Sequence, residues 1–119
     1  DRLRRTCNEE LEIIALGTNS LATSMMLKAG ANEGATGENA IVYNSTRVDM
    51  ILGSVGIVCA NSFLGELTPK MAEAIAESSV KKVLIPLNKC NVLVVGIENK
   101  SLPHYIEDVV EIVKNYGGR

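Results

Sequence analysis

The sequence predicts an α/β protein, a three-layer sandwich with a mostly parallel sheet and an antiparallel hairpin near the C-terminus. Short, continuously apolar runs alternate with segments whose apolar residues recur at helical spacing. Strands that are apolar throughout are typical of a parallel sheet covered by helices. Two late apolar runs, 81–87 and 91–97, are joined by a segment too short for a crossover helix, and this favours a hairpin.

The first half of the chain divides into short elements. The charged residues 2–9 are compatible with a helix, and 11–17 is an apolar run of strand length that ends in glycine. Apolar residues over 18–30 recur on one face of a helix. Two short strands are expected next, over 40–44 and 48–53.

The second half carries clearer helix signals. Residues 54–67 fit either an irregular loop or a short helix. A helix is expected over 68–79, because Thr68 can cap it and a proline occupies its favoured first position. The last helix, over 101–118, begins at the candidate cap Ser101 and ends at a pair of glycines. Its apolar stripe is expected to comprise Leu102, Ile106, Val109, Val110 and Val113.

Composition indicates one globular domain over residues 1–119, with 46% apolar residues, 22% charged residues and a net charge of −2. Aromatic residues make up only 3%, and the basic clusters are small, which argues against nucleic-acid binding. The longest weakly polar run, 50–60, is too short to span a membrane. Three widely spaced cysteines without a CxxC pair favour reduced thiols and a cytoplasmic location.

Several blocks resemble one family. The segments "ALGTN", "KAGAN…GATGENAI", "LGELTPKMAEAI" and "IPLNKCN" look like those of small bacterial proteins grouped as a domain of unknown function. The resemblance covers about residues 11–115 and implies a Rossmann-like fold with no established activity. Family members typically open with a further strand and a glycine-rich turn, whereas this sequence starts inside what would be the first helix, so we expect it to be N-terminally truncated.

The absent strand has a physical consequence. In a doubly wound sheet the first strand is central, and its carboxyl end helps to form the ligand crevice. Without it, the strand 11–17 would expose an edge that other chains could pair with. Either residues upstream of Asp1 fill the gap, or another strand or subunit does.

The glycine-rich stretch 29–44 raises the question of a phosphate-binding loop. Such a loop follows a strand and opens a helix, whereas here a helix is expected to end at Gly30 and a strand to start near Ala40. We therefore interpret Gly30, Gly34 and Gly37 as a helix C-cap and turn residues. The polar cluster in this loop could instead form a lid or a subunit contact; it comprises Asn32, Glu33, Thr36, Glu38 and Asn39.

Two loops that leave strands are better placed, because open α/β sheets bind ligands at the carboxyl ends of their strands. The first comprises Gly17, Thr18, Asn19 and Ser20, at a helix N-terminus that attracts anions. Simple capping explains it equally well. The second loop spans residues 53–66. It could form a wall of the ligand site, or its polar side chains could simply hydrogen-bond to nearby backbone groups. Its candidate residues are Gly53, Gly56, Asn61, Ser62 and Glu66.

A third candidate wall lies at the tip of the expected hairpin, at Asn88, Lys89 and Cys90. Lys89 could bind an anionic group and could lower the pKa of Cys90 to make it a nucleophile. A turn, however, favours asparagine for backbone reasons, and a lone cysteine is more often inert.

Catalytic and metal-binding signals are weak. The only histidine, His104, lies in the first turn of the last helix without an identifiable partner. Cys59, Cys90 and His104 lack the close spacing of zinc ligands. No catalytic residue, metal or particular cofactor is therefore indicated.

These observations lead to three functional hypotheses. The first is a Rossmann-like module that binds a small anionic or nucleotide-like ligand at the carboxyl ends of its parallel strands. The second is a structural or regulatory protein that acts by self-association, as a homo-oligomer. The third is an enzyme that uses Cys90 as a redox or acyl-transfer thiol.

Overall fold

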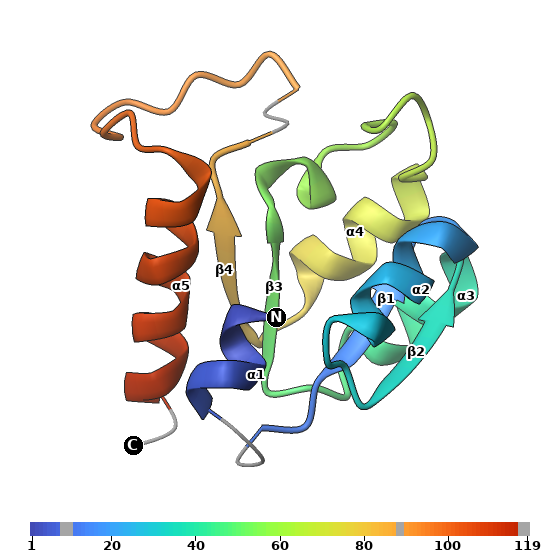
Figure 1. Ribbon diagram of the computed structural model, residues 1–119. Coiled ribbons are helices and arrows are strands. Elements are labelled where there is room, and N and C mark those ends of the chain that lie inside the picture. The colour runs from blue at the N-terminus through green and yellow to red at the C-terminus, as the bar shows by residue number, and fades with distance from the viewer. Residues whose placement is uncertain (8–10, 88–89, 117–119) are drawn as a thin grey trace.

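The computed structural model describes residues 1–7, 11–87 and 90–116 and shows a mixed α/β fold (Figure 1). Its elements are α1 (Arg2–Cys7), β1 (Ile14–Gly17), α2 (Ser20–Lys28), β2 (Glu33–Thr36), α3 (Glu38–Asn44), β3 (Met50–Ser54), the 3₁₀ helix η2 (Val55–Val58), α4 (Pro69–Glu77), β4 (Lys81–Ile85) and α5 (Leu102–Tyr116).

The strands form two separate parallel pairs within the described residues. In one pair β1 lies beside β2, with Ile14 opposite Glu33. In the other, β3 lies beside β4, with Met50 opposite Lys81. The predicted parallel pairing is confirmed, but a single Rossmann-like sheet is not observed, because no described strand links β1 to β3 (Figure 1).

The main core lies between the strand pairs and helices α3 and α4. Ile41 of α3 packs with Met71 and Ile75 of α4, and all three are buried. Leu67 is the most deeply buried large residue, and Leu16 and Ile51 bring the two strand pairs onto this cluster. Aliphatic side chains and methionine thus form the core, as the scarcity of aromatic residues requires.

The helix starts predicted within residues 18–20 and at Thr68 are confirmed, and of Thr18, Asn19 and Ser20 it is Asn19 that caps α2. The Asn19 side chain accepts a hydrogen bond from the backbone N–H of Ala22, and Thr68 accepts one from Met71. Pro69 occupies the first position of α4, where its missing N–H is not needed. These caps satisfy backbone donors that no helical carbonyl can reach.

The prediction of a strand over 40–44 is wrong, because these residues belong to α3. A short apolar run cannot by itself distinguish a strand from a buried helix turn. The strand instead occupies Glu33–Thr36, inside the stretch that we interpreted as a loop. Gly37 follows with φ of 102°, a conformation suited to glycine, and α3 begins at the next residue. Gly37 therefore follows a strand and opens a helix, which is the order that our interpretation of this stretch had excluded.

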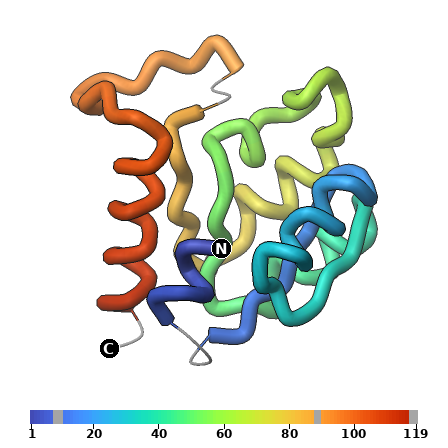
Figure 2. The backbone as a smooth tube through the Cα atoms, in the orientation of Figure 1, coloured from blue at the N-terminus to red at the C-terminus, as the bar shows by residue number. Residues whose placement is uncertain are grey.

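The predicted hairpin is also wrong. Only the first of its two strands forms, as β4, and it pairs in parallel with β3. Residues 91–97 form no strand and run at the molecular surface between β4 and α5 (Figure 2). Positive φ angles at Cys90, Asn91 and Gly96 interrupt the extended backbone that a strand needs.

The last helix, α5, packs against α1 and β4 and buries Val110 and Val113, two residues of its predicted apolar stripe. Leu102, which was expected on the same stripe, is 47% exposed because it lies at the end of the helix. Ser101 contacts the ring of His104 through its side chain, and its carbonyl accepts backbone hydrogen bonds from His104 and Tyr105. Among the described residues, no helix has the length and apolar character needed to cross a membrane.

Candidate functional site

A carboxylate joins two of the predicted ligand loops. One oxygen of Glu66 accepts a hydrogen bond from the Thr18 hydroxyl at 2.8 Å and from the Asn19 amide at 3.0 Å. These hydrogen bonds, first that of Thr18 and then that of Asn19, lower the pKa of Glu66. The structure thus brings the 17–20 loop and the end of the 53–66 segment together.

The approach of this carboxylate depends on how β1 ends. Gly17 is the last residue of β1 and is buried. A Cβ atom there would lie 2.8 Å from the backbone nitrogen of Thr23 and 2.9 Å from the Asn19 carbonyl oxygen. Glycine therefore allows the chain to turn directly from β1 into α2, and this turn presents Thr18 and Asn19 at the helix N-terminus.

The carboxyl end of β2 adds polar groups that the sequence interpretation placed in a connector. The Gly37 N–H donates to the Gly17 carbonyl at 2.9 Å, which sets the turns after β1 and β2 side by side. The hydroxyls of Thr23 and Thr36 lie 2.8 Å apart. The sequence signal for this turn was Gly37, which lies between a short strand and Glu38. The signal was missed because the four residues of β2 are small or polar and do not by themselves predict a strand.

A second carboxylate lies at the start of α3. Glu38 accepts a hydrogen bond of 2.6 Å from the Thr68 hydroxyl, which caps α4. The first turns of α3 and α4 are therefore tied together. Neither Glu38 nor Thr68 was predicted as a ligand residue, although Glu38 was placed in the polar cluster.

The remaining candidates of the 53–66 segment serve its own backbone. Gly53 lies in β3, and Gly56 lies in η2, where its carbonyl accepts a 2.6 Å hydrogen bond from the Ser62 hydroxyl. Asn61 has φ of 68°, and its N–H donates to the Leu67 carbonyl at 2.7 Å. These hydrogen bonds close the loop that leads to Glu66. Gly56, Asn61 and Ser62 therefore stabilise the loop that positions this carboxylate.

At the third candidate wall, Asn88 and Lys89 lie outside the described residues. Cys90 is exposed and has φ of 53°. Its thiol interacts with Cys59, whose pKa is raised by a hydrogen bond to Cys90 and then by burial. The structure therefore brings together two cysteines from distant segments, a proximity that their spacing did not indicate.

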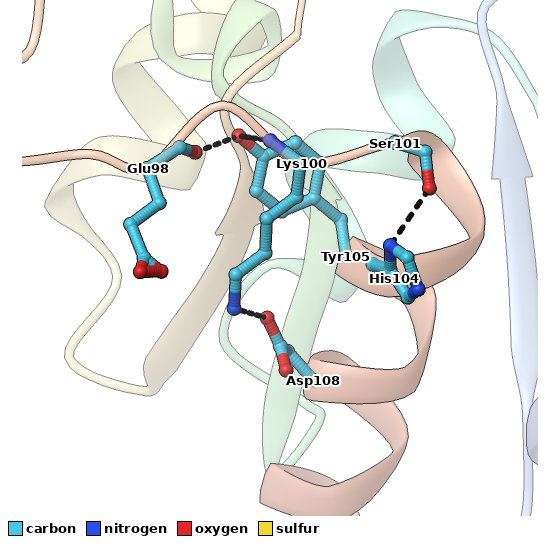
Figure 3. A network of polar contacts seen from close by, with 6 residues as sticks. All are labelled: Glu98, Lys100, Ser101, His104, Tyr105 and Asp108. Atoms are coloured by element: carbon cyan, nitrogen blue, oxygen red, sulfur yellow. Dashed lines mark hydrogen bonds and ion pairs between the residues drawn. The ribbon is translucent and has the colours of Figure 1, made fainter.

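His104 belongs to a polar network at the start of α5 (Figure 3). Its Nδ1 atom lies 3.0 Å from the Ser101 hydroxyl. Nearby, the Tyr105 hydroxyl donates to the Glu98 carbonyl at 2.6 Å, and Lys100 forms a 2.7 Å ion pair with Asp108. These contacts fasten the chain that enters α5. No group of three or more potential metal ligands gathers in the part of the chain that the structure describes.

The fold and this site define a class of α/β protein in which polar turns at the ends of parallel strands meet around acidic side chains. The profile of a family described as "Domain of unknown function (DUF3842)" matches residues 1–117. The chain belongs to this family, as its resemblance indicated. No curated protein and no solved structure gives a significant match.

Proposed function

We propose that the protein binds a small anionic, nucleotide-like ligand where β1, β2 and β3 end. The observation that carries the proposal is the pair of hydrogen bonds from Thr18 and Asn19 to Glu66. Helix N-termini attract anions, and the Glu66 carboxylate already lies on two side chains that immediately precede α2. A ligand phosphate would displace Glu66 and take over its two donors.

The neighbouring groups support a sugar-containing ligand. Carboxylates accept hydrogen bonds from ribose hydroxyls in dinucleotide-binding folds. Here Glu66, once displaced, and Glu38 offer carboxylates close to the turns after β1 and β2. We therefore propose a ligand that combines a phosphate with a hydroxylated sugar, and we assign no reaction to the site.

Thermal unfolding with three probes tests this proposal: adenosine monophosphate, adenosine and inorganic phosphate. We expect the nucleotide to raise Tm, because a ligand that binds only the folded state stabilises it. Asn19→Ala should remove most of this rise. Glu73→Ala, a change of an exposed carboxylate on α4, should leave it unchanged.

The variant Glu66→Ala separates the two parts of the ligand. It removes the competing carboxylate, so inorganic phosphate should bind more tightly. It also removes an acceptor for sugar hydroxyls, so adenosine should bind more weakly. A protein whose Tm responds to none of the three probes contradicts the proposal.

Self-association is a second candidate function, supported by a different observation. Leu93 and Val95 are 88% and 94% exposed in the segment between β4 and α5. Exposed apolar patches of this kind mark interaction surfaces. Light scattering should show a concentration-dependent mass that Val95→Asp reduces to that of a monomer. A monomer at all concentrations contradicts this candidate.

A further inference from the structure

Two cysteines from distant segments meet beyond the carboxyl ends of β3 and β4. These strands are parallel, with Ser54 opposite Ile85 at their last residues, and Figure 1 shows both arrows pointing to the same end of the molecule. Cys59 is the fifth residue after Ser54, and Cys90 is the fifth residue after Ile85. The parallel pairing therefore brings the two segments that carry these thiols to one end of the strand pair.

The two thiols are in contact but differ in exposure. Cys59 directly follows η2, and its thiol donates to the Val55 carbonyl at 3.6 Å. A further hydrogen bond joins it to the thiol of Cys90, and this contact, followed by burial, raises the pKa of Cys59. Cys59 is partly buried, whereas Cys90 is exposed. Cys90 is consequently the thiol that a dissolved reagent meets first.

The backbone around Cys90 leaves its thiol room to move. Cys90 and Asn91 have φ of 53° and 63°, so the chain turns at this point. Residues 91–97 form no strand and are all exposed. A segment with so little buried surface can shift without loss of packing. The Cys90 sulfur can therefore move from hydrogen-bond contact to covalent contact with Cys59.

We propose that Cys59 and Cys90 form a dithiol pair that hydrogen peroxide converts reversibly into a disulfide. The Cys90 sulfur attacks one peroxide oxygen and the O–O bond breaks. The hydroxide released takes up the Cys90 proton and leaves as water, and Cys90 becomes a sulfenic acid. The Cys59 sulfur then attacks the Cys90 sulfur, so the S–S bond forms, the S–O bond breaks and a second water leaves with the Cys59 proton.

The overall reaction is balanced by the peroxide. Two thiols lose two protons and two electrons, and one hydrogen peroxide becomes two waters. A small dithiol such as dithiothreitol reverses the step by exchange and is itself oxidised to a disulfide. The order of attack follows from the contact between the thiols. Because Cys90 is the larger cause of the raised pKa of Cys59, its conversion to a neutral sulfenic acid makes Cys59 easier to ionise.

Other roles fit these thiols less well. A structural zinc site needs about four ligands, and no group of three potential ligands gathers in the described parts of the chain. A cysteine that only fills the core is buried, whereas Cys90 is exposed. The disulfide would join the segment that carries Glu66 to the exposed segment 91–97. The pair therefore goes beyond the proposed ligand site and does not rest on it.

Peroxide treatment followed by thiol labelling tests the pair without any ligand, so its failure is distinct from failure of the proposed function. The reduced 119-residue chain is treated with equimolar hydrogen peroxide and then unfolded in guanidinium chloride with excess N-ethylmaleimide. We expect labelling of Cys7 alone, and peptide mapping should find Cys59 joined to Cys90. Dithiothreitol should restore labelling of all three cysteines.

Three results of this experiment overturn the proposal. They are a disulfide that includes Cys7, a sulfinic acid at Cys90 beside a labelled Cys59, and unchanged labelling of all three cysteines. A dilution series separates a bond within one chain from a bond between chains. The final yield should stay constant over an about tenfold dilution, because the reaction is intramolecular. Disulfide-linked dimers whose amount falls on dilution would show that the bond joins two molecules and that the proposal is wrong.

Two matched alanine variants test the role of Cys59. In Cys59→Ala the sulfenic acid has no partner, so dimedone, which traps sulfenic acids, should label Cys90 at least about tenfold more than in the unaltered chain. Cys7→Ala changes the cysteine outside the pair and should leave this labelling unchanged. Equal labelling in Cys59→Ala and the unaltered chain overturns the proposal. If circular dichroism shows that Cys59→Ala does not fold, the peroxide and dilution measurements decide alone.

Discussion

The Thr68 hydroxyl donates a 2.6 Å hydrogen bond to the carboxylate of Glu38, thirty positions earlier in the chain. The same hydroxyl oxygen accepts a hydrogen bond from the backbone N–H of Met71. One side chain therefore both caps α4 and ties that helix to the start of α3. A cap with a second partner contributes more than a cap exposed to water.

Removal of this hydroxyl should destabilise the protein. Thr68→Ala is expected to lower the free energy of unfolding by about 1–2 kcal/mol, since both the cap and the partner of Glu38 are lost. Thr68→Ser keeps the hydroxyl and should retain most of the stability. Urea denaturation of both variants measures the difference. Equal losses would show that the methyl group, and not the hydroxyl, is what matters.

The turn after β1 should tolerate no side chain. Gly17→Ala places a methyl group against the backbone of Thr23 and Asn19, and we expect a loss of about 1–3 kcal/mol in unfolding free energy. Gly53→Ala is the control, because its methyl group would meet the end of the Ile57 side chain, which can rotate away. A smaller loss at Gly17 than at Gly53 would contradict the geometry of this turn.

The link between Glu66 and the 17–20 loop should depend on pH. Its hydrogen bonds hold the folded-state pKa of Glu66 below the unfolded value, near 4.3 for glutamate. The contribution is therefore fully present above the unfolded pKa and is lost as the pH falls through the lowered folded value. Carbon-13 NMR of the Glu66 carboxyl group measures the midpoint directly.

A matched pair of threonine variants tests the cause of this shift. Thr18→Val removes the first donor and should raise the midpoint of Glu66 toward the ordinary value. Thr46→Val changes an exposed threonine outside the loop and should leave the midpoint in place. An unchanged midpoint in Thr18→Val would show that this hydrogen bond is absent in solution.

The two neighbouring thiols should differ in reactivity. The pKa of Cys59 is raised by its hydrogen bond to Cys90 and by burial, so Cys59 should react slowly with iodoacetamide near neutral pH. Cys90→Ala removes the larger cause and should move the alkylation midpoint of Cys59 to lower pH. Cys7→Ala, at the buried position of α1, should have no such effect. A midpoint that moves equally in both variants would argue against the thiol pair.

The sequence was most informative where local chemistry decides the structure. Asn19, Thr68 and the proline after Thr68 act through the backbone beside them, so their roles follow from residue type. The strand at Glu33–Thr36 is different. Its residues are small or polar, and their extended form depends on pairing with β1, which a local pattern does not contain.

The sequence likewise indicated one part of the candidate site and missed another. The rule that ligands bind at the carboxyl ends of parallel strands directed attention to Thr18, Asn19 and Glu66, which the structure brings into contact, while their role in binding a ligand stays a prediction. The contacts of Thr36 and Gly37 were missed because β2, which ends at Thr36, was not predicted. The exposure of residues 91–97 could not be foreseen either, because their continuous apolar run is also typical of a buried strand, whereas here it pairs with no strand of the described residues.

Helices α3 and α4 are fastened at both ends. Beyond the Thr68–Glu38 contact at their starts, the Ser78 hydroxyl at the end of α4 donates to the carbonyl of Ser45, which follows α3. Two anchors at opposite ends prevent sliding as well as pivoting. If the proposed ligand binds, we therefore expect any rearrangement to fall in the connection that carries Glu66, while the two helices move together as one block.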